Sequence, residues 1–265
     1  MPELPEVEHA ASIARAVAIG RTITSVLVLH PAQRRGLPIR EARSLAGDRV
    51  VSVERRGKAQ RFRLASGREL RVHFRMTGDW LLPASGPLPR SARAVLEFDD
   101  GGRLVLDDPR ALSVLSLCAA GEAEGDGLGP DALDPAMSGR HLAAALATRR
   151  IPIKVALLDQ SIVAGIGNIY ASESLWRARI DPRTPANRLT RERLGPLVRA
   201  IRATMKGALK RQQRYYGSGG EGSDENRFAV YDREGERCRR CGGTIKRIIQ
   251  SARSTYFCPK CQAKG

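Results

Sequence analysis

The segment CRRCGGTIKRIIQSARSTYFCPKC, residues 238–261, begins and ends with a pair of cysteines. Cys238 and Cys241 form one C-x-x-C pair, Cys258 and Cys261 form the other, and sixteen residues separate the pairs. Two residues between ligands allow a tight turn to direct both sulfurs at one ion, and this spacing is typical of a four-thiolate zinc ribbon. We therefore predict a short β-hairpin held by one structural Zn²⁺ ion, with sulfur in all four positions around the metal.

The alternatives for these cysteines are disulfide bonds or unpaired thiols. Disulfide frameworks belong mainly to secreted chains, and the N-terminal residues lack the basic and apolar regions of a signal peptide. The fifth cysteine, Cys118, has no partner nearby in the sequence, and we expect it to be a small buried residue. Basic residues lie along the predicted hairpin. They predict either a contact with phosphates or a solvated basic face.

The charge balance of the chain points to a polyanionic partner. Its 265 residues include 45 Lys and Arg against 28 Asp and Glu, a formal net charge of +17. Nucleic acid is the first candidate and an anionic membrane surface the second, because a purely solubilising charge needs no such bias. No apolar run is long enough to cross a bilayer. We expect a cytoplasmic protein.

Hydrophobic patterns divide the chain into a strand-rich part and a helical part. Residues 5–19 have the periodicity of a helix, with Val7, Ala10, Ala14 and Val17 on one stripe. Runs that alternate in period two follow, separated by Gly or Pro turns, as in an antiparallel sandwich or barrel. The expected strands are residues 22–30, 49–56, 60–65, 69–76, 93–100 and 103–108. The expected helices of the second part are residues 139–148, 152–160, 168–178 and 190–214.

Two segments have the composition of connections. Residues 118–138 are rich in Gly, Pro and acidic residues, and we expect them to link the two parts. The segment GSGGEGSDEN, residues 217–226, is expected to be a flexible loop.

A glycine-flanked turn, Ala164–Asn168, lies between two predicted helices in LLDQSIVAGIGNIYASESL, residues 157–175. Glycines permit close backbone approach, and N–H groups at the start of a helix can hold an anion. Most Gly-x-Gly segments are only turns. In a chain of this charge, a helix–turn–helix with glycines is a better candidate for a phosphate cradle.

The chain opens with MPELPEVEHA, which has a local and a chemical interpretation. Pro and Glu are both common in the first turn of a helix, so the residues alone favour a helix start. The chemical interpretation is that Pro2 becomes a free secondary amine once Met1 is removed. An α-amine has a pKa near 7.7–8.0, so roughly one in seven is neutral at pH 7 and able to act as a nucleophile.

Seven segments, in order along the chain, resemble the formamidopyrimidine-DNA glycosylase/endonuclease VIII family. They are PELPEVE (2–8), RRGK (55–58), HFRMTG (73–78), DDPR (107–110), LGPDAL (128–133), residues 157–175, and the four-cysteine ribbon. The resemblance implies an α+β fold with an N-terminal helix and antiparallel β-sandwich, a helix–two-turn–helix domain and a C-terminal β-hairpin zinc finger. With it we assign residues 1–117 to the catalytic helix and sandwich, 118–138 to the linker, 139–223 to the helical domain and 224–265 to the zinc finger.

The resemblance also implies an activity and a partner. Members of the family excise oxidised bases from double-stranded DNA and then cleave the strand at the abasic site by β,δ-elimination. This chain is therefore expected to be a bifunctional DNA glycosylase and abasic-site lyase, acting as a monomer and associated with the nucleoid. Its metal is expected to be the single structural Zn²⁺ ion.

The family's nucleophile corresponds to Pro2. Attack of the neutral amine on the sugar C1′ as the base departs gives a cationic iminium, which acidifies the C2′ protons and permits elimination. Glu3 matches the acid/base carboxylate of the family, and Glu6 matches a second acidic position that supports it.

Five residues are candidate DNA contacts, four of which match the family. Lys58, His73, Asn168 and Arg253 match the phosphate clamp, and Lys154 is a further candidate DNA contact. Holding the flanking phosphates offsets the few kcal/mol that flipping a nucleotide costs. Taken one at a time, the charged residues could equally be solvated surface groups, and a histidine in a strand is more often a core or rim residue.

The wedge that fills the gap left by a flipped base is where the sequence departs from the pattern. Met76 and Arg110 match two of its three side chains, but the family's PRRFG is PRALS here, so Leu112 stands in place of a phenylalanine. The segment before the zinc ribbon looks shorter than the lesion-capping loop of the formamidopyrimidine branch, and its DEN is similar to the endonuclease VIII branch. The sequence therefore leaves the branch open and predicts a preference for ring-opened purines, hydantoins or oxidised pyrimidines over 8-oxoguanine.

Two other functions remain as alternatives. One is a non-catalytic DNA-binding relative that keeps the clamp and ribbon, although it would have no need of both Pro2 and Glu3. The other is a zinc-ribbon RNA-binding protein, which would have no reason for the opening motif.

Overall fold

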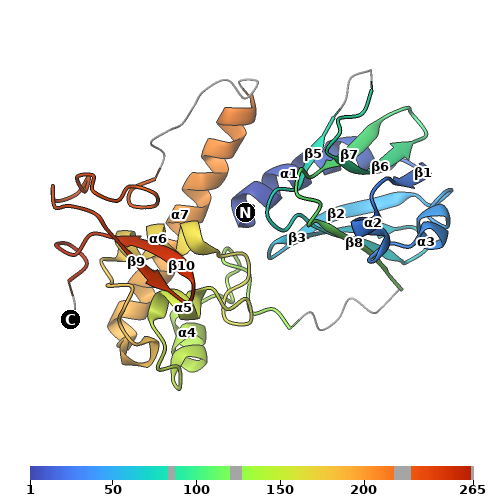
Figure 1. Ribbon diagram of the computed structural model, residues 1–265. Helices are drawn as coiled ribbons and strands as arrows, with labels where there is room; N and C mark the ends of the chain where they lie inside the picture. The colour runs from blue at the N-terminus through green and yellow to red at the C-terminus, as the bar shows by residue number, and fades with distance from the viewer. Residues whose placement is uncertain (83–86, 120–126, 218–227, 264–265) are drawn as a thin grey trace. The chain divides into compact units, whose positions relative to one another are not determined.

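The computed structural model describes residues 1–82, 87–119, 127–217 and 228–263. The chain forms two compact units, Met1–Asp126 and Gly127–Gly265 (Figure 1). Each unit has its own hydrophobic core, and each carries part of the predicted site.

The first unit begins with helix α1, Leu4–Ala18. Glu3 is its N-cap and Pro5 lies in its first turn, where the fixed φ of proline suits a helix and its missing N–H costs nothing. Pro2 therefore precedes the helix and is not the proline that starts it. The predicted apolar stripe is buried at Val7 and Ala10, among others, and is half-buried at Val17.

Two four-stranded antiparallel sheets follow (Figure 1). The first has the order β1 (Ile23–Val28), β6 (Ala92–Phe98), β7 (Arg103–Asp107), β5 (Asp79–Leu81). The second has the order β2 (Val50–Arg56), β3 (Ala59–Leu64), β4 (Glu69–His73), β8 (Val114–Cys118). Two short helices, α2 (Pro31–Arg34) and α3 (Ile39–Arg43), connect β1 to β2. The antiparallel sandwich expected from the resemblance is confirmed.

The sequence missed β5, β8, α2 and α3. β5 and α2 have only three and four residues, which is too short to establish a period, whereas β8 and α3 were missed although they are as long as β4. It was also wrong about Cys118, which is half-buried rather than buried. This cysteine ends the edge strand β8, where it pairs with Glu69 of β4, so one side of it remains open.

Side chains from α1 and from both sheets form one core. Trp80 lies at its centre, with its ring edge-on to Phe62 and to Phe74 at centroid distances of 5.9 Å. Its indole N–H donates to Gln60 Oε1 at 2.7 Å, and the Gln60 amide donates to Val7 O of α1 at 3.3 Å. The Trp80 indole and the Gln60 amide are thus paired, and they fix α1 against the sheets.

The second unit contains the helices and the hairpin. Its helices are α4 (Gly139–Leu146), α5 (Ile153–Leu157), α6 (Asn168–Ala178) and α7 (Arg191–Gly217), with a 3₁₀ turn η1 at Ala186–Arg188. Residues 127–138, from the predicted linker, lie in this unit, where Ala132 N–H donates to Ala164 O at 3.0 Å. Within the described residues, no helix is long and apolar enough to cross a membrane.

Strands β9 (Lys246–Gln250) and β10 (Arg253–Phe257) form the C-terminal hairpin. Its two turn residues, Ser251 and Ala252, have φ of +48° and +58°. Positive φ at both central residues is the geometry of a tight two-residue hairpin, and it brings Arg253 to the tip. Most of the predicted flexible loop, residues 217–226, lies outside the described residues.

Candidate active site, phosphate clamp and zinc centre

The first part of the candidate site is the N-terminal segment. Pro2 is half-buried, and the adjacent Glu3 is only 1% exposed. Glu3 and Glu6 form a capping box, in which the Glu3 backbone N–H donates to Glu6 Oε2 at 3.0 Å and the Glu3 side chain accepts from the Glu6 backbone. The helix start therefore holds a buried carboxylate beside the N-terminal proline, so the local and the chemical interpretation of these residues are compatible.

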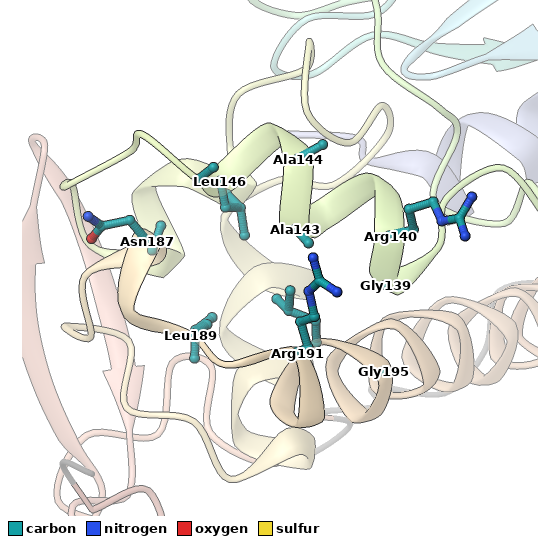
Figure 2. A pocket seen from close by; sticks show the side chains of 12 residues that line it. Gly139, Arg140, Ala143, Ala144, Leu146, Asn187, Leu189, Arg191 and Gly195 are labelled. Atoms are coloured by element: carbon teal, nitrogen blue, oxygen red, sulfur yellow. The ribbon is translucent and has the colours of Figure 1, made fainter.

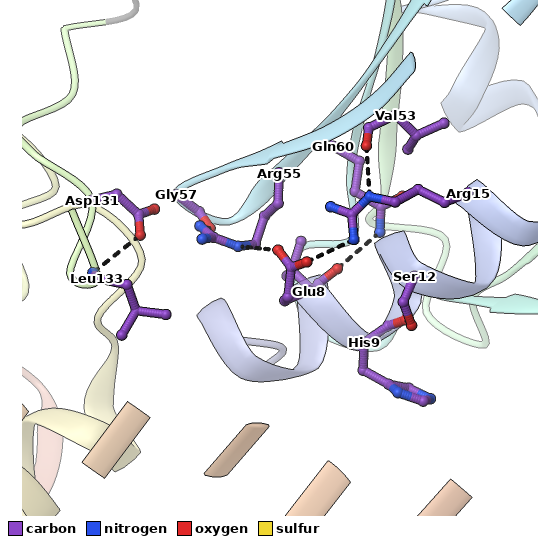
Figure 3. A network of polar contacts seen from close by, with 11 residues as sticks. Glu8, His9, Ser12, Arg15, Val53, Arg55, Gly57, Gln60, Asp131 and Leu133 are labelled. Atoms are coloured by element: carbon purple, nitrogen blue, oxygen red, sulfur yellow. Dashed lines mark hydrogen bonds and ion pairs between the residues drawn. The ribbon is translucent and has the colours of Figure 1, made fainter. Parts of the chain in front are cut away.

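A network of ion pairs joins α1 to the hairpin of β2 and β3 (Figure 3). Glu8 of α1 accepts from Arg15 Nη1 at 2.7 Å and from Arg55 Nε at 2.9 Å. Arg55 also donates to the carbonyl of Gly57 at 3.1 Å, inside the turn between the two strands. This turn carries Lys58, so the network places the lysine and the N-terminal segment on one rigid body.

His73 lies at the end of β4, opposite Ala59 in the neighbouring strand β3. Burial, with smaller contributions from the charges of Arg75 and Lys58, lowers its pKa to about 4. Its Nδ1 accepts the Arg75 backbone N–H at 3.0 Å, which leaves the proton of the neutral ring on Nε2. Near pH 7 His73 can offer a hydrogen bond to a phosphate but no positive charge.

The three predicted wedge residues lie within two loops, one between β4 and β5 and the other between β7 and β8. Met76 and Leu112 are exposed hydrophobic residues, at 40% and 42%, and Arg110 is exposed as well. The residue beside each apolar side chain has a strained backbone, with φ of +58° at Arg75 and +53° at Ala111. Left-handed geometry at non-glycine residues persists only where the surroundings enforce it.

Asp108, which is fully buried, connects these two loops. Its carboxylate accepts the hydroxyl of Thr77, next to Met76, and the backbone N–H groups of Leu112 at 2.6 Å and Ser113 at 2.7 Å. Burial by itself raises the pKa of Asp108, but hydrogen bonds from Thr77, Ser113 and Leu112 outweigh it and hold the pKa below its ordinary value. An ionised carboxylate thus fixes the backbone that presents the wedge.

In the second unit, Asn168 is the first residue of α6 and connects two neighbouring elements. Its Oδ1 accepts from Lys154 Nζ of α5 at 2.5 Å, and its Nδ2 donates to Ser254 O of β10 at 2.9 Å. Lys154 is fully buried, and Arg253, the residue before Ser254, is exposed. The structure therefore brings three predicted DNA contacts of this unit together, with Arg253 as the outermost cation.

The four cysteines of the ribbon converge, and their sulfurs all lie within 4.8 Å of one another. The Sγ–Sγ distances are 3.4 Å for Cys241–Cys258 and 3.8 Å for Cys238–Cys261. Tetrahedral zinc with Zn–S bonds of about 2.3 Å requires separations of about 3.8 Å. The residues fit one Zn²⁺ ion, as predicted.

Protein groups around the ribbon stabilise a thiolate at Cys238 but disfavour one at Cys261. Burial raises the pKa of the Cys238 thiol, but hydrogen bonds from the Trp176 indole and from backbone N–H groups bring it down to about 6. Burial and the neighbouring sulfurs raise the pKa of Cys261 to about 12, a repulsion that a bound cation relieves. Trp176 belongs to α6, and Arg240 stacks on its ring at 4.0 Å, so the ribbon is attached to the helix that begins with Asn168.

Sequence reasoning missed several residues that position the site. Asp108 belongs to the DDPR segment, but its structural role was not predicted. Its position directly before Pro109, where a turn is expected, was the one signal in the sequence for that role. Glu8 and Arg55 are separated by 47 residues, and no local pattern pairs them. Glu173 of α6 accepts three backbone N–H groups, from Ala229 to Tyr231, and this contact also has no local signal.

Comparisons with known proteins agree with this arrangement. Residues 1–115 match the family model of the formamidopyrimidine-DNA glycosylase N-terminal domain, and residues 128–217 match that of its H2TH domain. Residues 235–264 match a zinc finger found in FPG and IleRS. A formamidopyrimidine-DNA glycosylase of Chloroflexus aurantiacus is 42% identical, over 99% of this chain and 98% of its own length. The chain belongs to the formamidopyrimidine-DNA glycosylase family.

Other members of the formamidopyrimidine-DNA glycosylase family agree along the whole chain. The enzyme of Acidiphilium cryptum is 41% identical over 99% of this chain and all of its own length. MutM (FPG) from Thermus thermophilus superimposes with a TM-score of 0.85 at 36% identity, covering all of both chains. A complex of Lactococcus lactis Fpg with abasic-site DNA gives a TM-score of 0.90 at 29% identity, over 99% of this chain and 100% of that one. The fold and the zinc finger of the family are thus confirmed.

Proposed function

We propose that this protein excises damaged bases from double-stranded DNA and then cleaves the strand, with Pro2 as nucleophile and Glu3 as the acid/base group. One observation carries the proposal: Pro2 stands outside α1, next to a buried carboxylate, while Pro5 performs the structural task at the helix start. The family relationship adds support, because its solved members include Fpg bound to DNA with an abasic site.

The reaction follows from these two groups. The neutral amine of Pro2 forms a bond to C1′ while the glycosidic C–N bond breaks, and the departing base takes up the proton that the amine nitrogen loses. Glu3 supplies the proton needed as the sugar ring opens. The resulting iminium is cationic, so a C2′ proton is lost and the 3′ phosphate leaves, and a second elimination releases the 5′ phosphate. Water then frees the amine.

Four further residues hold the DNA. Lys58, Asn168 and Arg253 contact phosphates on either side of the extruded nucleotide, which offsets the cost of breaking its stacking. His73 adds a neutral hydrogen bond through Nε2, because its pKa near 4 leaves it uncharged. We infer that the protein acts where chromosomal DNA lies, in the bacterial cytoplasm.

The substrate preference rests on the wedge. Leu112 is smaller than a phenylalanine and has no aromatic face, so it supports a well-stacked duplex less firmly. Lesions that are already poorly stacked cost less to flip. Ring-opened purines, hydantoins and oxidised pyrimidines are therefore the proposed substrates, ahead of 8-oxoguanine. Single-turnover excision rates for each lesion opposite each of the four bases test this order, and fastest removal of 8-oxoguanine opposite cytosine would overturn it.

The test of the mechanism is covalent trapping. Protein whose N-terminus is confirmed as Pro2 by mass spectrometry is incubated with abasic-site duplex and borohydride, and the adduct is located by peptide mapping. The proposal requires the adduct on Pro2. An adduct on a lysine, or none with a confirmed free Pro2, contradicts it. Protein that retains Met1 is the matched control and should give no adduct.

A further inference from the structure

A groove of about 850 Å³ lies in the second unit between α4 and the segment that leads into α7 (Figure 2). The two helices come close at one end, where a Cβ on Gly139 would lie 3.5 Å from the backbone nitrogen of Gly195. Farther along, Ala143 and Ala144 of α4 and its C-cap Ala147 are small and leave the space open, while Leu146 adds a larger apolar side chain to the lining. The floor is therefore apolar and shaped by packed helices.

Cationic side chains border this apolar floor. Arg140 extends from the first turn of α4 and Arg191 from the first turn of α7, and both are exposed (Figure 2). Among the residues that the structure describes, neither guanidinium makes a hydrogen bond or an ion pair. Glu192, adjacent to Arg191, is exposed and does not line the groove. An apolar floor with exposed arginines at its edge favours a ligand that is both apolar and anionic, although the charge of Arg191 also acts on the neighbouring Glu192.

A second pocket of about 520 Å³ continues this surface, because Leu189 lines both hollows. It contains the side chains of Arg183, Arg188 and Arg193. Its one acidic group, Asp181, is buried and already paired with Arg183 at 2.5 Å. The combined surface thus carries several cations in excess of its carboxylates.

We propose that this groove, residues 139–147 with 186–195, binds an acidic segment of a partner protein. The segment inserts a bulky apolar side chain between α4 and η1 and sets its carboxylates against the arginines of the two hollows. A buried apolar anchor surrounded by charge is the usual arrangement of a small protein interface. The DNA backbone is the weaker candidate, because phosphates and sugars have no apolar side chain to fill the groove.

The proposed surface is independent of the DNA site. None of the predicted DNA contacts in this unit, Lys154, Asn168 and Arg253, lines either hollow. The partner segment and duplex DNA should therefore bind without displacing one another, which separates this proposal from the proposed enzymatic function.

The experiment uses two fluorescein-labelled peptides and the full-length protein at near-physiological ionic strength. Both peptides carry a block of aspartates, followed in one by a phenylalanine and in the other by an alanine. Fluorescence anisotropy should show the phenylalanine peptide binding about tenfold more tightly, since the anchor supplies most of the affinity. Ala147→Leu, which fills the groove, and the double change Arg140→Glu/Arg191→Glu should each weaken that binding about tenfold.

The double change Arg40→Glu/Arg43→Glu, at two exposed arginines of α3, is the matched control for a change of charge and should bind like the wild type. Circular dichroism melting and borohydride trapping should be unchanged in every variant. Equal binding of the two peptides, or unaltered binding by the groove variants, overturns the proposal. Displacement of the peptide by undamaged duplex DNA also overturns it and assigns the groove to nucleic acid.

Discussion

Glu3 is a carboxylate that serves both the helix and the proposed chemistry, and one substitution separates the two roles. Glu3→Gln keeps an oxygen that can accept the capping hydrogen bond, but it cannot transfer a proton. We expect base excision to fall by about 10²- to 10⁴-fold, the usual contribution of general acid–base catalysis. Cleavage of ready-made abasic sites should fall less, because there the base has already left.

Single-turnover assays on a lesion duplex and on an abasic-site duplex measure both effects in Glu3→Gln. Glu41→Gln is the control, since Glu41 is an exposed carboxylate in the first turn of α3 that has no proposed role in the chemistry. An equal loss in the two assays would contradict the proton-transfer role of Glu3.

His73 makes the stability of the fold depend on pH. Its pKa is about 4 in the folded protein, against about 6.5 in an unfolded chain. Above pH 6.5 the imidazole ring is neutral in both states, so His73 does not lower the free energy of unfolding. As pH falls from 6.5 to 4 the unfolded state takes up a proton that the folded state does not, so the free energy of unfolding decreases. At pH 5 this linkage corresponds to about 2 kcal/mol.

The variant His73→Asn tests this linkage, because its side-chain oxygen can accept the Arg75 N–H in place of Nδ1. Urea unfolding at pH 7 and pH 5 should show the wild type losing about 2 kcal/mol more than the variant. Equal losses in the two proteins would show that His73 protonates in the folded state as readily as in the unfolded chain.

The zinc hairpin is an element that depends on its metal more than on its own core. Its described apolar cluster is small, with Val230, Ile245 and Tyr256 among its members. We expect Cys241→Ser to lose zinc and to reduce DNA binding strongly, because the hairpin that carries Arg253 loses its support. The sandwich of the first unit should remain folded.

Metal analysis, DNA-binding titration and limited proteolysis measure these effects of Cys241→Ser. Cys118→Ser is the matched control, because Cys118 is remote in sequence from the ribbon and should leave zinc content unchanged. Full zinc content in Cys241→Ser would contradict the four-cysteine site.

The elements differ in how far the sequence predicted them. The helix at α6 and the long strands were predictable, because each repeats its apolar pattern over several residues. β5 was missed, since its three residues define no period, and β8 was missed although it is as long as β4 and β7. The candidate site was predictable where a motif is local, as at Cys238 and Cys241. The contact of Glu8 with Arg55 was not, because only the tertiary fold brings α1 to β2.

The molecule as a whole carries a charge of +17, and this determines how it approaches DNA. Binding to undamaged duplex should fall steeply with salt, because the arginines and lysines displace counterions from phosphates. Arg253→Ala should weaken binding to all sequences and reduce the slope of log affinity against log salt by about one unit.

Affinity titrations over a range of salt concentrations give this slope for Arg253→Ala. Arg40→Ala, which removes an exposed charge of the first unit that matches no clamp position, should leave the slope unaltered. An unchanged slope in Arg253→Ala would remove that residue from the phosphate clamp.

The buried position of Asp108 affects how readily the sequence of the wedge loop can change. Its carboxylate fixes the wedge loops through backbone N–H groups and the Thr77 hydroxyl, so the side chains at 110–112 do not determine the shape of their loop. We therefore expect that these side chains can be exchanged, and the proposed lesion preference altered, while the loop keeps its shape. PRALS, at positions where the family pattern is expected to have PRRFG, is a difference of this kind. The residue that makes specificity evolvable is thus one that faces the protein interior and is itself proposed to touch no DNA.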